Sequence, residues 1–190
     1  MKSKIDFSKN KSLLLTNGKI LDITNGKTFS KDILISNGQI VEIGKISKND
    51  DYHIIDCENC IITQSFIDIH THFQTPGIGD QETFVSGSHS ALSGGYSKIC
   101  IMPNTLPIID NPELVQFIFD KTSSLPIDIY PIGAITKKLE GIELAELGSM
   151  INAGAVALSD ADFPIMNSQV MRYALEYAKM FDVPVINHPQ

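Results

Sequence analysis

Arginine is almost absent from this 190-residue sequence, and Arg172 is its only example. The formal net charge is -7, which leaves little of the clustered positive charge that sequence-independent binding to nucleic acid or to an anionic membrane requires. The sequence also lacks an apolar run near the roughly 18 residues of a membrane helix. Apolar residues still make up 43% of the chain. We therefore expect a globular protein that binds neither nucleic acid nor a membrane.

Cysteine is scarce as well, and three residues are too few for a disulfide framework. Cys57 and Cys60 form a C-x-x-C pair, for which a redox or zinc role is one interpretation and two small residues around a turn is the other. The second is favoured, because no further C-x-x-C completes a zinc site. Residues 1–12 contain lysine but no apolar stretch typical of a secretory signal. We therefore expect a cytoplasmic protein with reduced thiols.

Tight turns dominate the first 60 residues. The pairs Asn17-Gly18, Asn25-Gly26 and Asn37-Gly38 tolerate the positive φ of hairpin turns. The runs between them are β-branched or alternate apolar with polar residues, as strands do. They cover residues 13–15, 19–23, 32–36 and 39–43. The sequence predicts a small antiparallel, sandwich-like β module over residues 1–60.

From residue 61 onward, apolar runs alternate with helical patterns, which is typical of a parallel sheet built from βαβ units. The predicted strands cover residues 61–69, 98–102, 127–133, 155–159 and 183–187. The predicted helices lie near residues 83–94, 112–123, 143–153 and 168–181. We expect an α/β fold in which residues 61–190 form an incomplete (β/α) TIM-type barrel with about five of its eight strands.

Polar residues follow the carboxyl ends of these predicted strands. His70 and His72 end the first, and neighbours two apart in a strand point the same way. Imidazole pairs at one barrel mouth suit a divalent metal such as zinc. The other polar residues at strand ends are Asn104, Asp160, Asp162 and His188. The sequence predicts that these side chains meet at one site.

The ordered segments "FIDIHTHFQTPG", "MPNT", "PIGAITKKLEG", "AGAVALSDADFPI" and "VPVINH" resemble dihydroorotase, of the amidohydrolase superfamily. The resemblance implies a metal-dependent hydrolase of cyclic amide C–N bonds that interconverts dihydroorotate and carbamoyl aspartate in pyrimidine biosynthesis. It implies one or two zinc ions, with His70 and His72 as ligands of the first and His188 as a ligand of the second. It also implies that Asn104 binds the carboxylate side of the substrate.

Two positions depart from the family pattern. Gln74 replaces an arginine that grips the substrate carboxylate, and loss of such a buried pair costs roughly 2–5 kcal/mol of binding. A glutamine in this place recovers one neutral hydrogen bond. Ala161 stands where a metal-binding aspartate is expected, flanked by Asp160 and Asp162. Either neighbour is a candidate ligand, although alternation along a strand argues against a simple exchange with Asp162.

Length is the third departure, because an eight-stranded barrel takes about 250 residues and only 130 follow residue 60. The catalytic general-base aspartate of the family is expected beyond residue 190. Three hypotheses stay open: a dihydroorotase-type enzyme, truncated and impaired; a non-catalytic homologue that acts as structural partner of aspartate transcarbamoylase; or a gene fragment without function. We also expect self-association of the chain through open strand edges.

Overall fold

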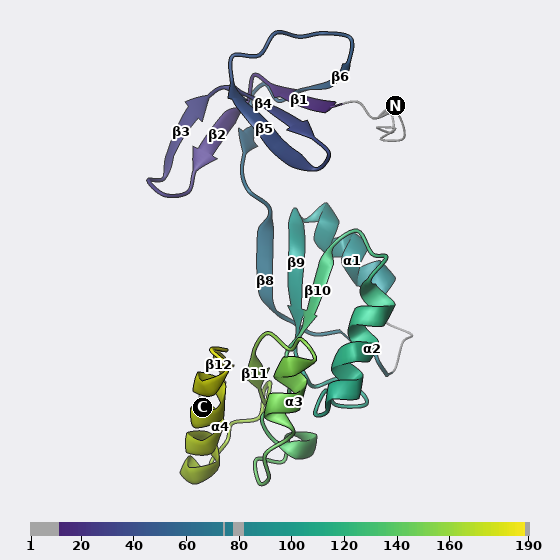
Figure 1. Ribbon diagram of the computed structural model, residues 1–190, viewed down its shortest axis with the longest axis vertical. Helices are drawn as coiled ribbons and strands as arrows, with labels where there is room; N and C mark the ends of the chain where they lie inside the picture. Colours follow the sequence, from purple (N-terminus) through teal and green to yellow (C-terminus); the bar gives the residue numbers. More distant parts are fainter. Residues whose placement is uncertain (1–11, 74, 78–81, 189–190) are drawn as a thin grey trace. The chain divides into compact units, whose positions relative to one another are not determined.

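The computed structural model describes residues 12–73, 75–77 and 82–188 (Figure 1). The chain divides into two compact units, residues 1–64 and 65–190. The predicted boundary after residue 60 therefore differs from the observed one by a short segment. That segment contains β7 (Ile61–Ile62), which pairs with β2 (Lys19–Asp22) inside the first unit. The apolar run at residues 61–69 is thus two strands that belong to different units.

The first unit consists of two small sheets. One has the order β5-β4-β1-β6, and the other has the order β3-β2-β7. The remaining strands are β1 (Ser12–Thr16), β3 (Lys27–Ser30), β4 (Asp32–Ser36), β5 (Gln39–Gly44) and β6 (Tyr52–Asp56). The prediction of a purely antiparallel module is wrong, because β1 pairs with β6 and β2 pairs with β7 in parallel. The chain between β5 and β6 carries β6 to the far edge of its sheet, where it runs beside β1 in the same direction.

The Asn-Gly turns adopt the backbone that the sequence predicts. Asn17 and Asn37 have φ values of 62° and 51°, and Gly26 has a φ of 68°. Asparagine and glycine enter this left-handed region at low steric cost. The turn at Gly26 joins β2 to β3, and the turn at Asn37 joins β4 to β5, and both of these strand pairs are antiparallel. β1 pairs with β4, and Leu14 and Ile33 of these strands are buried.

The second unit alternates strands with helices, as predicted. Its strands are β8 (Phe66–Thr71), β9 (Tyr96–Ile101), β10 (Asp128–Pro131), β11 (Leu158–Ser159) and β12 (Val185–Ile186). Its α-helices are α1 (Phe84–Ser93), α2 (Pro112–Thr122), α3 (Leu147–Asn152) and α4 (Ser168–Met180). Within the described part of this unit, the named strands pair in parallel, and an isolated antiparallel bridge joins Thr136 to Leu144.

The strands of the second unit lie side by side in the order of the chain. β9 lies between β8 and β10, and β11 pairs with β12 (Figure 1). A parallel bridge from Gly133 to Leu158 joins the segment after β10 to β11. Because parallel strands in this order place their carboxyl ends along one edge, residues that follow different strands are brought together there.

Helices cover one side of these strands and bury the main core. α1 packs against β9, and α2 packs against β10. Ile99, Ile101 and Ile129 from the strands are buried with Val115 and Ile118 of α2. Asn111 caps α2 by accepting a hydrogen bond from the Leu114 amide at 3.0 Å, and Pro112 fits the first turn, where its missing N–H costs nothing. Among the described helices, none has the length and apolar character needed to cross a membrane.

Candidate metal centre

His70 and His72 lie at the carboxyl end of β8, where the strand is irregular. Asp68 pairs with Ile99 of β9 and Thr71 pairs with Ile101, so the register shifts between them and β8 has one more residue than β9 in this interval. A bulge of this kind re-aims side chains and is common beside functional sites. The Asp68 carboxylate accepts a hydrogen bond from the His70 amide at 3.0 Å, which fixes the backbone of the bulge.

The two imidazoles converge on one point. Their Nε2 atoms are 3.1 Å apart, and the rings meet edge to face with centroids 5.0 Å apart. Two nitrogen ligands held about 2.0–2.1 Å from a tetrahedral zinc ion lie roughly 3.3 Å from each other. The separation of the Nε2 atoms therefore fits a pair of zinc ligands.

Asn104 orients His72 from the loop that follows β9. Its Oδ1 lies 3.0 Å from Nδ1 of His72. An amide oxygen only accepts hydrogen bonds, so Nδ1 of His72 carries the proton and Nε2 keeps its lone pair. Metal-binding histidines commonly use the second ring nitrogen in this way. The substrate-binding role that the resemblance implied for Asn104 stays a prediction, and the structure shows Asn104 in contact with a candidate ligand.

Asp162 completes a group of three donors with the two histidines. One ligand atom from each of these exposed side chains lies within 4.8 Å of the others. The turn after β11 brings Asp162 there. Ala161 is almost fully buried, at 2% exposure, and has a φ of 51°, while the Phe163 amide donates to the Asp160 carbonyl at 3.0 Å. The strand has ended before this turn, so the alternation that argued against Asp162 no longer applies.

Asp160, the other candidate carboxylate, lies outside this group and is 3% exposed. Its Oδ1 accepts hydrogen bonds from the amides of Ile135 and Thr136 at 2.8 and 2.9 Å, and its Oδ2 accepts one from the Thr136 hydroxyl. Burial raises the pKa of Asp160, and the hydrogen bonds from Thr136 and Ile135 oppose that rise. Both oxygens are therefore engaged in holding the segment after β10, and the structure does not direct them at a metal.

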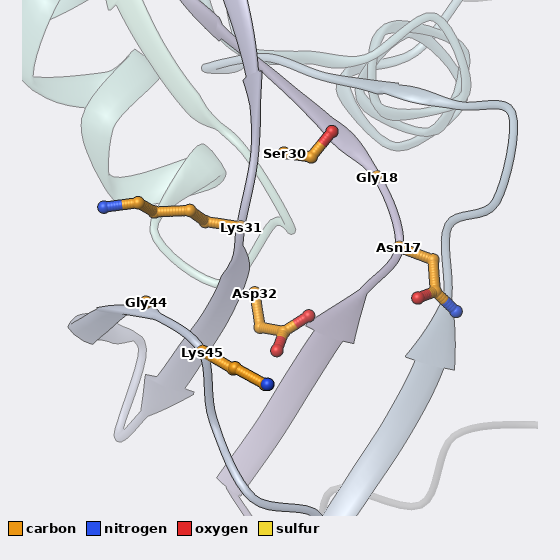
Figure 2. Close-up of a pocket in the computed structure, with 7 residues that line it drawn as sticks. All are labelled: Asn17, Gly18, Ser30, Lys31, Asp32, Gly44 and Lys45. Carbon is orange, nitrogen blue, oxygen red and sulfur yellow. The ribbon is translucent and has the colours of Figure 1, made fainter.

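His188 and Gln74 complete the predicted site residues. His188 is exposed just after β12, and among the described residues it is not within the group formed by His70, His72 and Asp162. Gln74 lies outside the described residues. No sequence pattern indicated Asp68 and Glu82, which line a hollow of about 270 Å³ together with His72. A second hollow, of about 370 Å³, lies in the first unit (Figure 2). Its lining consists of Asn17, Gly18, Ser30, Lys31, Asp32, Gly44 and Lys45. Asp32 there accepts a hydrogen bond from the Ile46 amide, and the lining contains neither histidine nor cysteine.

Comparison with known proteins matches residues 59–190 to the family model described as dihydro-orotase-like. The chain belongs to this dihydroorotase-like family. The family predicted from the sequence motifs is thus confirmed.

Curated relatives agree with this membership. The chain is 40% identical over 179 residues to a dihydroorotase from Syntrophotalea carbinolica, a match that covers 94% of this chain and 42% of the relative. A dihydroorotase from Clostridium acetobutylicum is 37% identical with the same coverage of both chains. The dihydroorotase-like chain thus spans about two fifths of the length of these relatives.

Solved structures show the fold that the chain shares. An L-hydantoinase from Arthrobacter aurescens superposes with a TM-score of 0.76 at 18% identity, over 93% of this chain and 40% of the other. A D-hydantoinase superposes with a TM-score of 0.71 at 23% identity, over 92% of this chain and 39% of the other. The α/β fold predicted from the alternating pattern is confirmed.

Proposed function

We propose that this chain carries the metal-binding part of a dihydroorotase-type cyclic amidohydrolase, which interconverts dihydroorotate and carbamoyl aspartate in pyrimidine biosynthesis. The observation that carries the proposal is the convergence of His70, His72 and Asp162 within 4.8 Å in a chain of the dihydroorotase-like family. We also propose a cytoplasmic location, which rests on the sequence alone.

Zinc is the proposed metal, because two imidazoles and one carboxylate form a donor set that zinc prefers. When bound, zinc lowers the pKa of a coordinated water and polarises a substrate carbonyl. Other features of the chain orient the two candidate histidine ligands. Asn104 holds the proton of His72 on Nδ1, and the bulge in β8 aims His70 at the same point. His188 is proposed to contribute to a second zinc ion from the end of β12.

The proposed architecture of residues 65–190 is the first five strands of a (β/α) barrel. The parallel pairing in chain order supports it, as does the placement of the candidate ligands at the carboxyl ends of β8 and β11. In such a barrel, residues at this edge face the substrate. The first unit is proposed to be an accessory β domain.

Recognition of the substrate carboxylate is proposed to be weak in this chain. Gln74 replaces the arginine of the family pattern, and the one arginine of the sequence lies on α4, where its Nε donates to Glu176 at 2.8 Å. Asn104 is engaged with His72. A neutral glutamine offers one hydrogen bond where an arginine offers two with charge, so affinity for a carboxylate is reduced.

Equilibrium dialysis with zinc tests the metal centre. We expect the chain to bind zinc, the double variant His70→Ala/His72→Ala to lose this binding, and Asp162→Asn to weaken it. His89→Ala is the matched control, because His89 is an exposed histidine of α1 outside the donor group. Equal zinc binding by the double variant and the control would refute the assignment.

The variant Gln74→Arg tests substrate recognition. Restoring a charged, two-pronged partner is expected to tighten binding of dihydroorotate by ~30-fold or more, which corresponds to the lower end of a buried ion pair. Calorimetric titration of the zinc-loaded protein gives the dissociation constants. A Gln74→Lys variant controls for charge without the two-pronged geometry. Unchanged affinity in Gln74→Arg would show that position 74 does not meet the substrate.

A second candidate function is that of a non-catalytic partner of aspartate transcarbamoylase. The observation that favours it is the neutral residue at position 74 in a chain whose single arginine is engaged elsewhere. Co-sedimentation of the two proteins at micromolar concentration would distinguish this function, because a structural partner binds whether or not His70 and His72 are intact.

A further inference from the structure

Cys57 and Cys60 lie on one tight turn of the first unit, between β6 and β7. The Cys60 amide donates a hydrogen bond to the Cys57 carbonyl at 2.9 Å, and Asn59 between them has a φ of 61°. A four-residue turn keeps its first and last Cα atoms within about 7 Å. That range overlaps the roughly 4.4–6.8 Å between the Cα atoms of a disulfide.

Both ends of this turn are fixed to the connection between β1 and β2. The Cys57 amide donates to the Thr16 carbonyl at 2.8 Å, and the Lys19 amide donates to the Cys60 carbonyl at 3.0 Å. The two cysteines are therefore held by neighbouring points of the same segment. Because the fold already fixes their backbones, joining their side chains costs little further chain entropy.

The two thiols differ in access. Both are free, Cys60 is exposed and Cys57 is half-buried. Burial raises the pKa of the Cys57 thiol, and the nearby Cys60 and Asp56 raise it further. Cys60 is therefore the thiol that meets a dissolved reagent, and Cys57 lies behind it.

We propose that Cys57 and Cys60 form a reversible disulfide by exchange with a small dissolved disulfide such as oxidised glutathione. The Cys60 thiolate attacks one sulfur of glutathione disulfide, forms a mixed disulfide and releases one glutathione thiolate. Cys57 loses its proton to solvent and attacks the Cys60 sulfur, which breaks the mixed disulfide and releases a second glutathione thiolate. Two protein thiols are thereby oxidised by two electrons, and one glutathione disulfide is reduced to two thiols.

This site is independent of the proposed metal centre, since none of its residues is a candidate ligand. The proposed disulfide would protect Cys60 from irreversible oxidation. Once the pair has closed, Cys60 is no longer a thiolate and does not proceed to sulfinic or sulfonic acid, which are irreversible states for most proteins. Reduction by glutathione breaks the disulfide and restores both thiols.

The test equilibrates the full chain in glutathione buffers of graded redox ratio, followed by acid quenching, alkylation and mass spectrometry. We expect the wild-type chain to lose two hydrogen atoms, with Cys57 and Cys60 both protected from alkylation and Cys100 still alkylated after unfolding. The variant Cys57→Ser is expected to accumulate glutathione on Cys60. Cys100→Ser is the matched control and should oxidise as the wild type does.

A further variant tests whether the geometry of the turn, and not only the short distance in sequence between Cys57 and Cys60, favours the disulfide. Asn59→Val places a β-branched residue where φ is positive, so oxidation should require a severalfold more oxidising buffer. Wild-type chain that carries glutathione on Cys60 while Cys57 remains alkylatable would overturn the proposal. So would wild-type chain that stays reduced at every ratio, or an Asn59→Val chain that oxidises as readily as the wild type.

Discussion

At the scale of single residues, the imidazole of His72 lies between two polar partners, one at each ring nitrogen. Nε2 faces His70 at 3.1 Å, and Nδ1 faces Asn104 at 3.0 Å. A histidine ring can rotate about its side-chain bonds, and either nitrogen can carry the proton. The Asn104 oxygen favours one ring orientation and the tautomer with the proton on Nδ1, which fits a positioning role for Asn104 at the proposed metal centre.

Replacement of Asn104 should therefore weaken zinc binding without removing a ligand. We expect Asn104→Leu to lower zinc affinity by ~10- to 100-fold, the usual cost of losing such an outer partner. Asn104→Asp keeps an oxygen acceptor and should retain most of the affinity. Competition with a chromophoric chelator measures both values, and equal loss in the two variants would contradict a role that depends on the acceptor oxygen.

At the scale of secondary-structure elements, Asp160 joins β11 to the segment that follows β10. Its carboxylate accepts two amide hydrogen bonds and one hydroxyl hydrogen bond from Ile135 and Thr136, and the Thr136 hydroxyl accepts one from the Gly141 amide. One buried side chain thus sets the start of a long loop. The same side chain precedes the Ala161 turn that carries Asp162.

Asp160→Ala should destabilise the chain by about 2–5 kcal/mol, because it leaves two buried amides without an acceptor. Asp160→Asn keeps an oxygen for both amides and should cost less. Urea unfolding, followed by circular dichroism, gives both free energies. An alanine variant as stable as the asparagine variant would show that solvent replaces these bonds.

The pH dependence follows from the same burial. Burial raises the pKa of Asp160 above its ordinary 3.8, so the folded chain holds this proton more tightly than the unfolded chain does. Its contribution to stability is therefore greatest below pH 3.8 and declines as the pH rises through the folded pKa. In the same urea experiments, the free energy of unfolding of the wild type should fall relative to that of Asp160→Asn as the pH rises from 3.8 through the folded pKa. A difference in unfolding free energy between the two proteins that does not change with pH would contradict this expectation.

Elements with a strong periodic pattern were predictable from the sequence, and short polar ones were not. β9, α2 and α4 lie where the apolar runs and helical faces placed them. β3 was missed, because the sequence KTFS is exposed at all four positions and has no buried face to create alternation. β6 was missed as a strand because its partner β1 is distant in sequence, and only tertiary pairing makes it a strand.

The candidate site was predictable in part for similar reasons. His70 and His72 follow from strand alternation at the end of an apolar run. Alternation argued against Asp162, but it does not apply at this position, since β11 ends at Ser159 and Ala161 takes a left-handed backbone that an alanine seldom adopts. No local pattern distinguishes Asp160 from Asp162, because burial by Ile135 and Thr136 is a property of the folded loop.

At the scale of the whole molecule, β8 presents an exposed apolar edge. Among the described residues it pairs with β9 alone, and Ile67 and Ile69 are 59% and 62% exposed. Strand edges with apolar side chains and free backbone groups recruit other chains. This exposure supports the self-association expected from the sequence.

We expect the purified chain to sediment as a concentration-dependent mixture of monomer and larger species. Lysine at an edge strand opposes such pairing, so Ile67→Lys should shift the distribution toward monomer. Val85→Lys is the matched control, because Val85 is an exposed apolar residue of α1 and not of a strand edge. A wild-type chain that stays monomeric across the concentration series would contradict this expectation.

The order of strands in the second unit has a consequence for the time at which the proposed metal centre can form. A ribosome delivers β8 first and β11 fourth, and each new strand finds its neighbour already made. His70 and His72 emerge with β8, whereas Asp162 emerges only after β9, β10 and β11. At usual elongation rates that interval is on the order of ten seconds. During that interval the nascent chain offers the histidine pair without Asp162, so under the proposed function a metal ion captured early would have two protein ligands and would exchange more freely than in the complete site.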